Sequence, residues 1–218
     1  MNNDRSAWKR PAVGEFVLIV VGVLVALLAE SWWAERQDRR AERQILVDAI
    51  TEFQENIEIL NADISQNILV YEYLLGVEAI SNAEMNAISD EEASELFALE
   101  NQNDAAFDPA MGIIDAAVRS GGLRFISDHE LRGHIARWSA LLTRSDRMEL
   151  QYTNFQMEGL WSKIPEFKAD GKWSIEERRE IREILANQKY PLKLVMDTMI
   201  DLRATAEKVL ERLGEVTQ

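Results

Sequence analysis

The apolar stretch near the N-terminus constrains this chain more than any other feature. Residues 11–33 read PAVGEFVLIVVGVLVALLAESWW, and no polar side chain occurs from Phe16 to Ala29. Such a run belongs in lipid, in the core of a soluble protein, or in a secretion signal that is later removed. A cut after Ala29 would place Leu27 at position −3, where a small residue is needed, so a cleavable signal fits badly. We therefore weigh a membrane span against a core helix.

Helix lengths favour the span. The uninterrupted apolar run is about 21 Å long as a helix, which is less than the hydrocarbon layer of a bilayer. Trp8 and Trp32, however, are about 36 Å apart along a helix, and tryptophan prefers the membrane–water interface. We predict that residues 11–33 form a transmembrane helix with Trp8, Trp32 and Trp33 as its interface anchors.

Small and acidic residues within this span suggest that it has a partner. Glu15 would lie in the membrane or at its shoulder, where a carboxylate is costly unless it is protonated, hydrogen-bonded or turned toward another helix. The alternative is that Glu15 extends to the headgroups. Small residues four apart allow helices to approach closely. The residues that we predict to pack against a partner in the membrane recur along one stripe: Gly14, Glu15, Leu18, Gly22, Ala26 and Glu30.

The span divides the chain into three parts: a short tail over residues 1–10, the transmembrane helix over 11–33, and a domain over 34–218. Basic residues flank the span on both sides, so their count does not decide its orientation. A short basic tail before a first apolar segment is the usual arrangement of a signal anchor. We expect a single-pass membrane protein with a cytoplasmic tail and an extracytoplasmic C-terminal domain.

The charge of the chain lies beyond the span. Residues 1–33 carry equal numbers of acidic and basic side chains, so the formal net charge of −14 belongs to residues 34–218. An acidic domain repels nucleic acid, which makes nucleic acid an unfavourable partner. The sequence contains no cysteine, which excludes disulfides, thiolate metal sites and cysteine nucleophiles.

The sequence after the span predicts a long helix that leaves the bilayer without a break. Apolar residues from position 46 onward are spaced 4, 3, 4, 3 and 4, which is typical of a coiled-coil seam. We expect this seam to shift by one residue after Ile64, through Ile68, Tyr71 and Leu75, and the helix to end between Ala79 and Asn82. The seam consists of Leu46, Ile50, Phe53, Ile57, Leu60 and Ile64.

Several further helices are indicated by capping and turn signals. We predict short helices at about 90–100 and 110–119, the second ended by Gly121 and Gly122. Capping boxes at Ser127–Glu130 and Ser174–Glu177 predict helices to about 161 and 187.

A last helix should begin at Pro191, with its apolar seam at Leu192, Val195, Met199, Leu202, Ala206, Val209 and Leu213. The predicted fold class is all-α, with a transmembrane helix that continues into an antiparallel helical bundle with coiled-coil-like seams.

Two stretches of the sequence look familiar: Gly14-Glu15 with the run from Gly22 to Leu27 and Trp32 before a charged helix, and the segment from Ser120 to Ile126. They resemble a family of small bacterial membrane-anchored proteins of unknown function, and this resemblance implies the bacterial inner membrane, with the C-terminal domain in the periplasm. The resemblance covers about a third of the chain, which departs from the family pattern over residues 28–31. It implies an anchor with a helical domain, and it carries over no catalytic residue.

No constellation of residues indicates catalysis. His129, Glu130 and His134 gather near one predicted helix start, but a separation of five residues puts the two imidazoles about 140° apart around a helix, unlike a zinc pair. No phosphate-binding loop or nucleophile elbow is present. We predict a protein that is not an enzyme and has no cofactor or metal.

The sequence favours a membrane-anchored scaffold or assembly protein, as a homo-oligomer or an accessory subunit of a larger membrane complex. Two alternatives stay open. Glu15 could serve a proton- or ion-conducting complex, or the bundle could sense a ligand.

Overall fold

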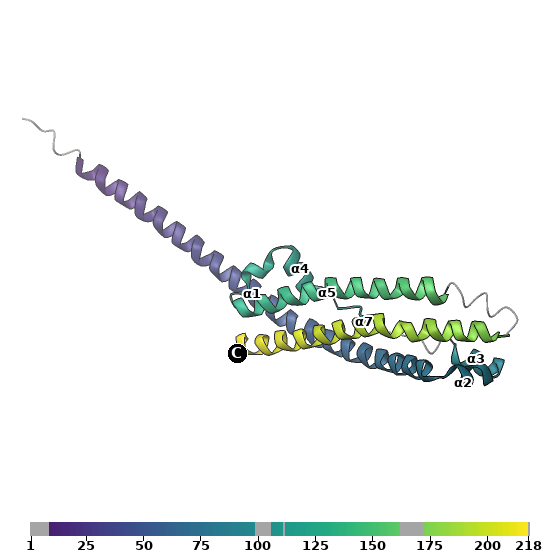
Figure 1. Ribbon diagram of the computed structural model, residues 1–218. Helices are drawn as coiled ribbons and strands as arrows, with labels where there is room; N and C mark the ends of the chain where they lie inside the picture. The colour runs from purple at the N-terminus through teal and green to yellow at the C-terminus, as the bar shows by residue number, and fades with distance from the viewer. Residues whose placement is uncertain (1–8, 99–105, 111, 162–171, 218) are drawn as a thin grey trace, which may run out of the picture.

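The computed structural model describes residues 9–98, 106–110, 112–161 and 172–217, and these residues contain helices and no strand (Figure 1). This confirms the predicted all-α class. The three long helices are α1 (Lys9–Ala79), α5 (His129–Gln156) and α7 (Ile175–Val216). The short helical elements are α2 (Asn82–Ala87), α3 (Asp90–Leu96), α4 (Ile113–Arg119), the 3₁₀ turn η2 (Gly122–Phe125) and the π turn η3 (Met157–Trp161).

Helix α1 joins the predicted span to the bundle without interruption. Its 71 residues correspond to about 107 Å of helix. The N-terminal part projects alone, and the C-terminal part lies within the bundle (Figure 1). The helix ends at Ala79, within the range predicted from the sequence. Helical backbone through residues 33 and 34 means that any movement of the span reaches the bundle directly.

The bundle is built around α7, which packs along both α1 and α5. α1 and α5 run in the same direction, and α7 runs antiparallel to both, with its end beside the point where α1 enters the bundle (Figure 1). Large aromatic side chains span the gap between α1 and α5. Trp138 meets Phe53 of α1 edge to face at 5.2 Å between ring centroids and Phe107 at 6.2 Å. These rings are almost fully buried and join α1, α5 and Phe107 in one core.

The seam of α1 follows a heptad repeat that differs in part from the predicted one. Ile50 and Ile57 only flank the core, whereas Asn56 and Asn67 occupy it at 1% and 0% exposure. The predicted shift after Ile64 is wrong, because Ile68 and Leu75 are 40% and 41% exposed. Asn67 instead continues the repeat and donates to the sulfur of Met199 at 3.4 Å. The buried positions seven apart are Leu46, Phe53, Leu60, Asn67 and Leu74.

Helix α7 is one helix of 42 residues, so the predicted break near residue 187 is wrong. Pro191 removes an N–H that would bond to the carbonyl of Asn187, but Asn187 is exposed and water can reach it. Every apolar residue of the predicted last seam is buried. The seam extends upstream through Ile181, Leu185 and the polar Gln188, all at 0% exposure. A polar residue in a core position hid the continuity of the pattern.

Capping explains where the other helices begin. Ser174 and Glu177 form the predicted capping box of α7 through reciprocal bonds of 2.7 and 3.2 Å. The capping box predicted at Ser127–Glu130 is wrong by one residue, because Asp128 caps α5 by accepting from the Leu131 N–H at 2.7 Å. Gly121, at φ +72°, provides the left-handed turn between α4 and η2.

Candidate functional site

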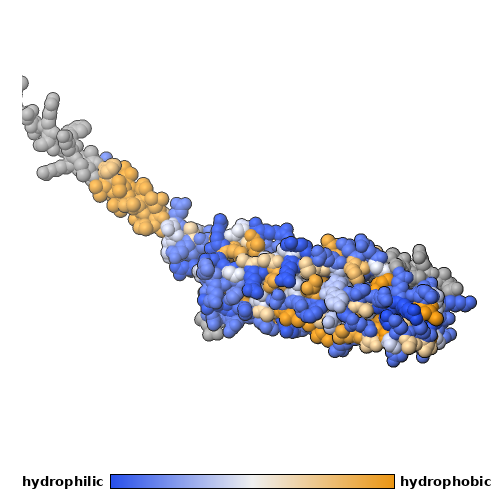
Figure 2. All heavy atoms as spheres, viewed as in Figure 1, coloured by the Kyte–Doolittle hydropathy of each residue, from blue (hydrophilic) through white to orange (hydrophobic). Residues whose placement is uncertain are grey.

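The projecting part of α1 is the first component of the candidate site. It is one helix that is long and apolar enough to cross a membrane, with a mean hydropathy of 2.3 over its most apolar window and no residue of that window buried. Figure 2 shows it as a continuous apolar cylinder between the grey N-terminal atoms and the polar surface of the bundle. Leu18 is 75% exposed and Leu28 is 70% exposed. Side chains of this kind need lipid or another protein around them.

The stripe predicted from small residues lies on this uncovered helix. Glu15, Leu18, Ala26 and Glu30 are exposed, and a Cβ added to Gly22 would meet nothing within 4 Å. Gly14 lies in the helix, and the structure does not describe its exposure. Within the described part of the chain, Glu15 forms no hydrogen bond or ion pair, and the described residues of the stripe are exposed.

The aromatic anchors mark the end of the apolar cylinder. Trp32 and Trp33 are 59% and 58% exposed, and the guanidinium of Arg36 lies 5.4 Å from the Trp32 ring centroid. Trp8, the anchor predicted at the other interface, lies outside the described residues. One tryptophan pair with an adjacent arginine is typical of a membrane–water boundary.

The connecting segment, residues 106–114 apart from Met111, ties α1 to the rest of the bundle. Glu52 of α1 is only 8% exposed and accepts from the N–H groups of Ile113 at 2.7 Å and Ile114 at 3.3 Å. Gly112, at the N-terminus of α4, offers no side chain for this purpose. A carboxylate at a helix N-terminus satisfies free N–H groups and the positive end of the helix dipole. Glu52 therefore caps α4 from another helix.

A second pair of contacts holds the connecting segment next to Glu52. The amide of Asn56 accepts from the Ala110 N–H at 2.9 Å and donates to the Ala110 carbonyl at 3.1 Å. From the other side, Glu149 of α5 accepts from the Phe107 N–H at 3.4 Å, and burial raises the pKa of this carboxyl. The segment thus occupies the space between α1 and α5, held by polar side chains from both.

The end of the bundle nearest the span is joined by ionic contacts. Glu42 of α1 accepts from both the N–H and the hydroxyl of Ser127, each at 2.7 Å. Asp128 forms an ion pair with Arg212 of α7 at 2.7 Å. Hydrogen bonds from Arg212 and then from the Leu131 N–H lower the pKa of Asp128 to about 2. All three long helices are therefore fixed to one another where α1 leaves the bundle.

A cleft of about 560 Å³ opens at this same end. Its walls combine arginines of α1, an apolar floor and the last residues of α7, including Arg39, Arg43, Leu46, Asp128 and Val216. The predicted imidazole cluster lies beside it, with His134 at 3.9 Å from Glu130 and His129 exposed. Among the described residues, no group of three or more His, Cys, Asp or Glu side chains could hold a metal ion.

The far end of the bundle is held in a similar way. The hydroxyl of Tyr73 donates to the Leu96 carbonyl at 2.6 Å, and Arg178 pairs with Asp90 at 2.6 Å. The N–H of Trp173 donates to Asp90 at 2.9 Å. Sequence reasoning missed these residues and Glu52, because a polar residue on a helix gives no sign of a backbone partner that is distant in sequence.

Comparison of the chain with models of known protein families, with curated proteins and with solved structures found no significant match. The family resemblance drawn from the N-terminal motif therefore stays a prediction.

Proposed function

We propose that this protein is a membrane-anchored, non-enzymatic helical assembly module, acting as a homo-oligomer or as an accessory subunit of a larger membrane complex. The observation that carries the proposal is the exposed apolar cylinder of α1, which includes an uncovered stripe of small residues. Lipid alone can cover the apolar surface, but a stripe of small residues serves close packing against another helix and is not needed for contact with lipid. The proposed location is the bacterial inner membrane, with the tail in the cytoplasm and the bundle in the periplasm.

The continuity of α1 supports a role in assembly. A partner that contacts the span acts on a rigid helix whose C-terminal part is hydrogen-bonded to the start of α4 and to Ser127 before α5, and packs along α7. Helix–helix contacts in the membrane would therefore fix the relative orientation of whole bundles. An assembly module needs such a connection, whereas a simple anchor would work equally well through a flexible linker.

Cysteine cross-linking in native membranes tests the contact. The chain has no cysteine of its own, so single substitutions give an unambiguous signal. We expect disulfide-linked dimers for Gly22→Cys and Ala26→Cys and none for Val20→Cys and Leu24→Cys, which lie on the opposite face at 100° per residue. Cross-linking of equal strength at all four positions would contradict a specific interface.

Cross-linking and blue-native electrophoresis together distinguish a contact between two copies of this chain from a contact with another protein. Blue-native electrophoresis in mild detergent would show a large particle in both cases, but cross-linked dimers only in the first. A small particle together with no cross-link would contradict both forms of the proposal.

Glu15 supports a second candidate, a single-span partner of a proton- or ion-conducting complex. The supporting observation is that Glu15 is exposed beside the apolar run and has no polar partner among the described side chains. Glu15→Gln should then abolish ion-dependent activity of the complex and leave its size unchanged. Full activity of the Gln variant would remove this candidate.

A further inference from the structure

Charge is unevenly distributed around the part of α1 that follows the apolar cylinder. Arginines at 36, 39, 40 and 43 fall within a sector of about 100° when successive residues are rotated by 100°. Trp32 and Trp33 fall in or beside the same sector. We call these six residues the aromatic–arginine face: Trp32, Trp33, Arg36, Arg39, Arg40 and Arg43.

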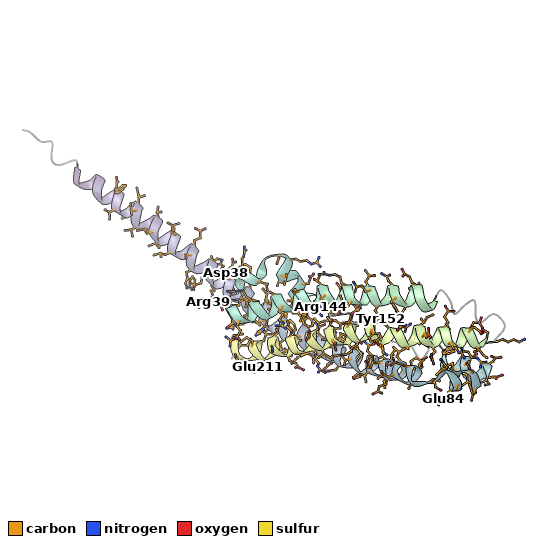
Figure 3. The ribbon with its side chains drawn as sticks, viewed as in Figure 1. Asp38, Arg39, Glu84, Arg144, Tyr152 and Glu211 are labelled. Carbon is orange, nitrogen blue, oxygen red and sulfur yellow. The ribbon has the colours of Figure 1, made fainter. Side chains whose placement is uncertain are left out.

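The acidic residues of this segment face elsewhere. Glu35, Asp38 and Glu42 lie on the neighbouring side of the helix, and Glu42 is engaged with Ser127 of the bundle. Figure 3 labels Asp38 and Arg39 where α1 meets the bundle. The segregation leaves the arginine side open to solvent, with a surface hollow of about 430 Å³ lined by all four arginines and Gln44.

Most of these arginines lack an acidic partner. Arg39 pairs with Glu35 at 2.5 Å. Within the described part of the chain, Arg36, Arg40 and Arg43 form no ion pair. Acidic residues are nevertheless abundant, because Asp and Glu recur from Asp48 to Asp115 without any Lys or Arg between them. A chain this acidic could have neutralised these cations with its own carboxylates, and it leaves them available for an external anion.

The position of the face identifies the anion. The headgroup layer is about 5 to 7 Å thick on each side of the hydrocarbon. Arg36 and Arg40 follow Trp32 by about 6 and 12 Å, and helical side chains tilt toward the N-terminus, which here is the direction of the membrane. Their guanidinium groups therefore reach the depth at which phospholipid phosphates lie.

We propose that the aromatic–arginine face binds the phosphate groups of anionic phospholipids. This inference rests on the membrane anchor of the proposed function, and it adds a defined lipid contact to it. Guanidinium groups bind phosphate in a bidentate manner, and the exposed indole rings hold the helix at the interface beside them. The contact fixes the rotation of α1 about its axis. It thereby fixes which face of the acidic bundle is turned toward the membrane.

Native mass spectrometry of the full-length chain in mild detergent tests this contact. The protein is mixed with equal amounts of phosphatidylglycerol and phosphatidylcholine, and retained lipid is counted for three proteins. These are the wild type, the combined Arg36→Gln, Arg40→Gln and Arg43→Gln variant, and a control with the same change of charge on α5. The control replaces Arg137, Arg144 and Arg147, which are exposed, and Figure 3 labels Arg144 away from the span.

We expect the wild type and the control to retain phosphatidylglycerol over phosphatidylcholine by at least about tenfold, and the variant on α1 to fall to about twofold. Equal retention by the wild type, or an undiminished preference in the α1 variant, overturns the headgroup site. Release of lipid by millimolar inorganic phosphate overturns it in favour of a free-phosphate site. Loss of associated copies rather than lipid in the α1 variant overturns it in favour of a protein contact.

The same spectra separate this inference from the proposed function. Assembled particles without lipid preference refute only the headgroup site. A monomer that retains phosphatidylglycerol refutes only the assembly role.

Discussion

Removing the Glu52 carboxylate should open α4 and the connecting segment while leaving the long helices in place. Glu52 is 8% exposed, and its Oε2 accepts from two backbone N–H groups at the start of α4, at 2.7 and 3.3 Å. In Glu52→Ala these two N–H groups lose the only acceptor that they have among the described residues. Gly112 cannot replace it, because glycine has no side chain to turn inward.

The expected cost follows from the type of bond. A hydrogen bond to a charged group contributes about 1.5 to 3 kcal/mol, and the loss of a helix cap costs about 0.5 to 2 kcal/mol. The two descriptions refer to the same interaction and are not added. We therefore expect local opening of α4 to become easier by about 2 kcal/mol, which is roughly a 30-fold increase in amide exchange.

Hydrogen exchange with mass spectrometry, on full-length protein in detergent, measures this effect locally. Peptides covering 112–119 should exchange faster in Glu52→Ala, and peptides of α7 should not change. Glu55→Ala is the matched control, since Glu55 is exposed one turn away and the charge change is the same. Unchanged exchange over 112–119 in Glu52→Ala would refute the capping role.

Three further substitutions test the polar residues of the core and the end of the bundle. Gln188 is fully buried and neither amide atom has a partner in the described structure, so Gln188→Met should stabilise the bundle by about 1 to 3 kcal/mol; a lower melting temperature would show that the amide is needed. Burial raises the pKa of Asp63 in the folded protein. The contribution of this carboxyl group to the free energy of unfolding is therefore complete below its pKa in the unfolded chain, about 3.9, and is lost as the pH rises through its pKa in the folded protein. Asp63→Asn should thus melt higher than wild type at pH 7 and equally below pH 4, and an equal difference at both would contradict this. The pKa of Asp128 is lowered to about 2 in the folded protein. Its contribution to the free energy of unfolding is therefore complete above the pKa of about 3.9 in the unfolded chain, and is lost as the pH falls through about 2. Asp128→Asn should melt lower at pH 7, with a gap that narrows from pH 5 to pH 2, whereas a constant gap would exclude the ion pair with Arg212 as its cause.

Apolar periodicity predicted the α7 seam and the end of α1, but in α1 it placed Ile50 and Ile57 where Ala49 and Asn56 are buried. The seam from Leu192 to Leu213 and the end of α1 at Ala79 follow from the sequence alone. Errors arose at Asn67 and Gln188, because a polar residue in a heptad position resembles the end of a pattern. A capping box can likewise be shifted when a stronger acceptor adjoins it, as Asp128 does beside Ser127.

The candidate site could be predicted only in part. An apolar run and its flanking tryptophans are local features, so the exposed cylinder of α1 was expected from residues 11–33. The contacts that fix this helix to the bundle join Glu42, Glu52 and Asn56 to backbone groups more than fifty residues away. Such contacts depend on the path of the connecting segment, which no pattern within α1 determines.

The mass of the particle extracted from native membranes tests the assembly role most directly. A single chain has a mass of 24.9 kDa. Native mass spectrometry in mild detergent should give a particle heavier than one chain, as a multiple of this mass for a homo-oligomer or with additional subunits for a larger complex. A particle of one chain with bound lipid and no other protein would contradict the account.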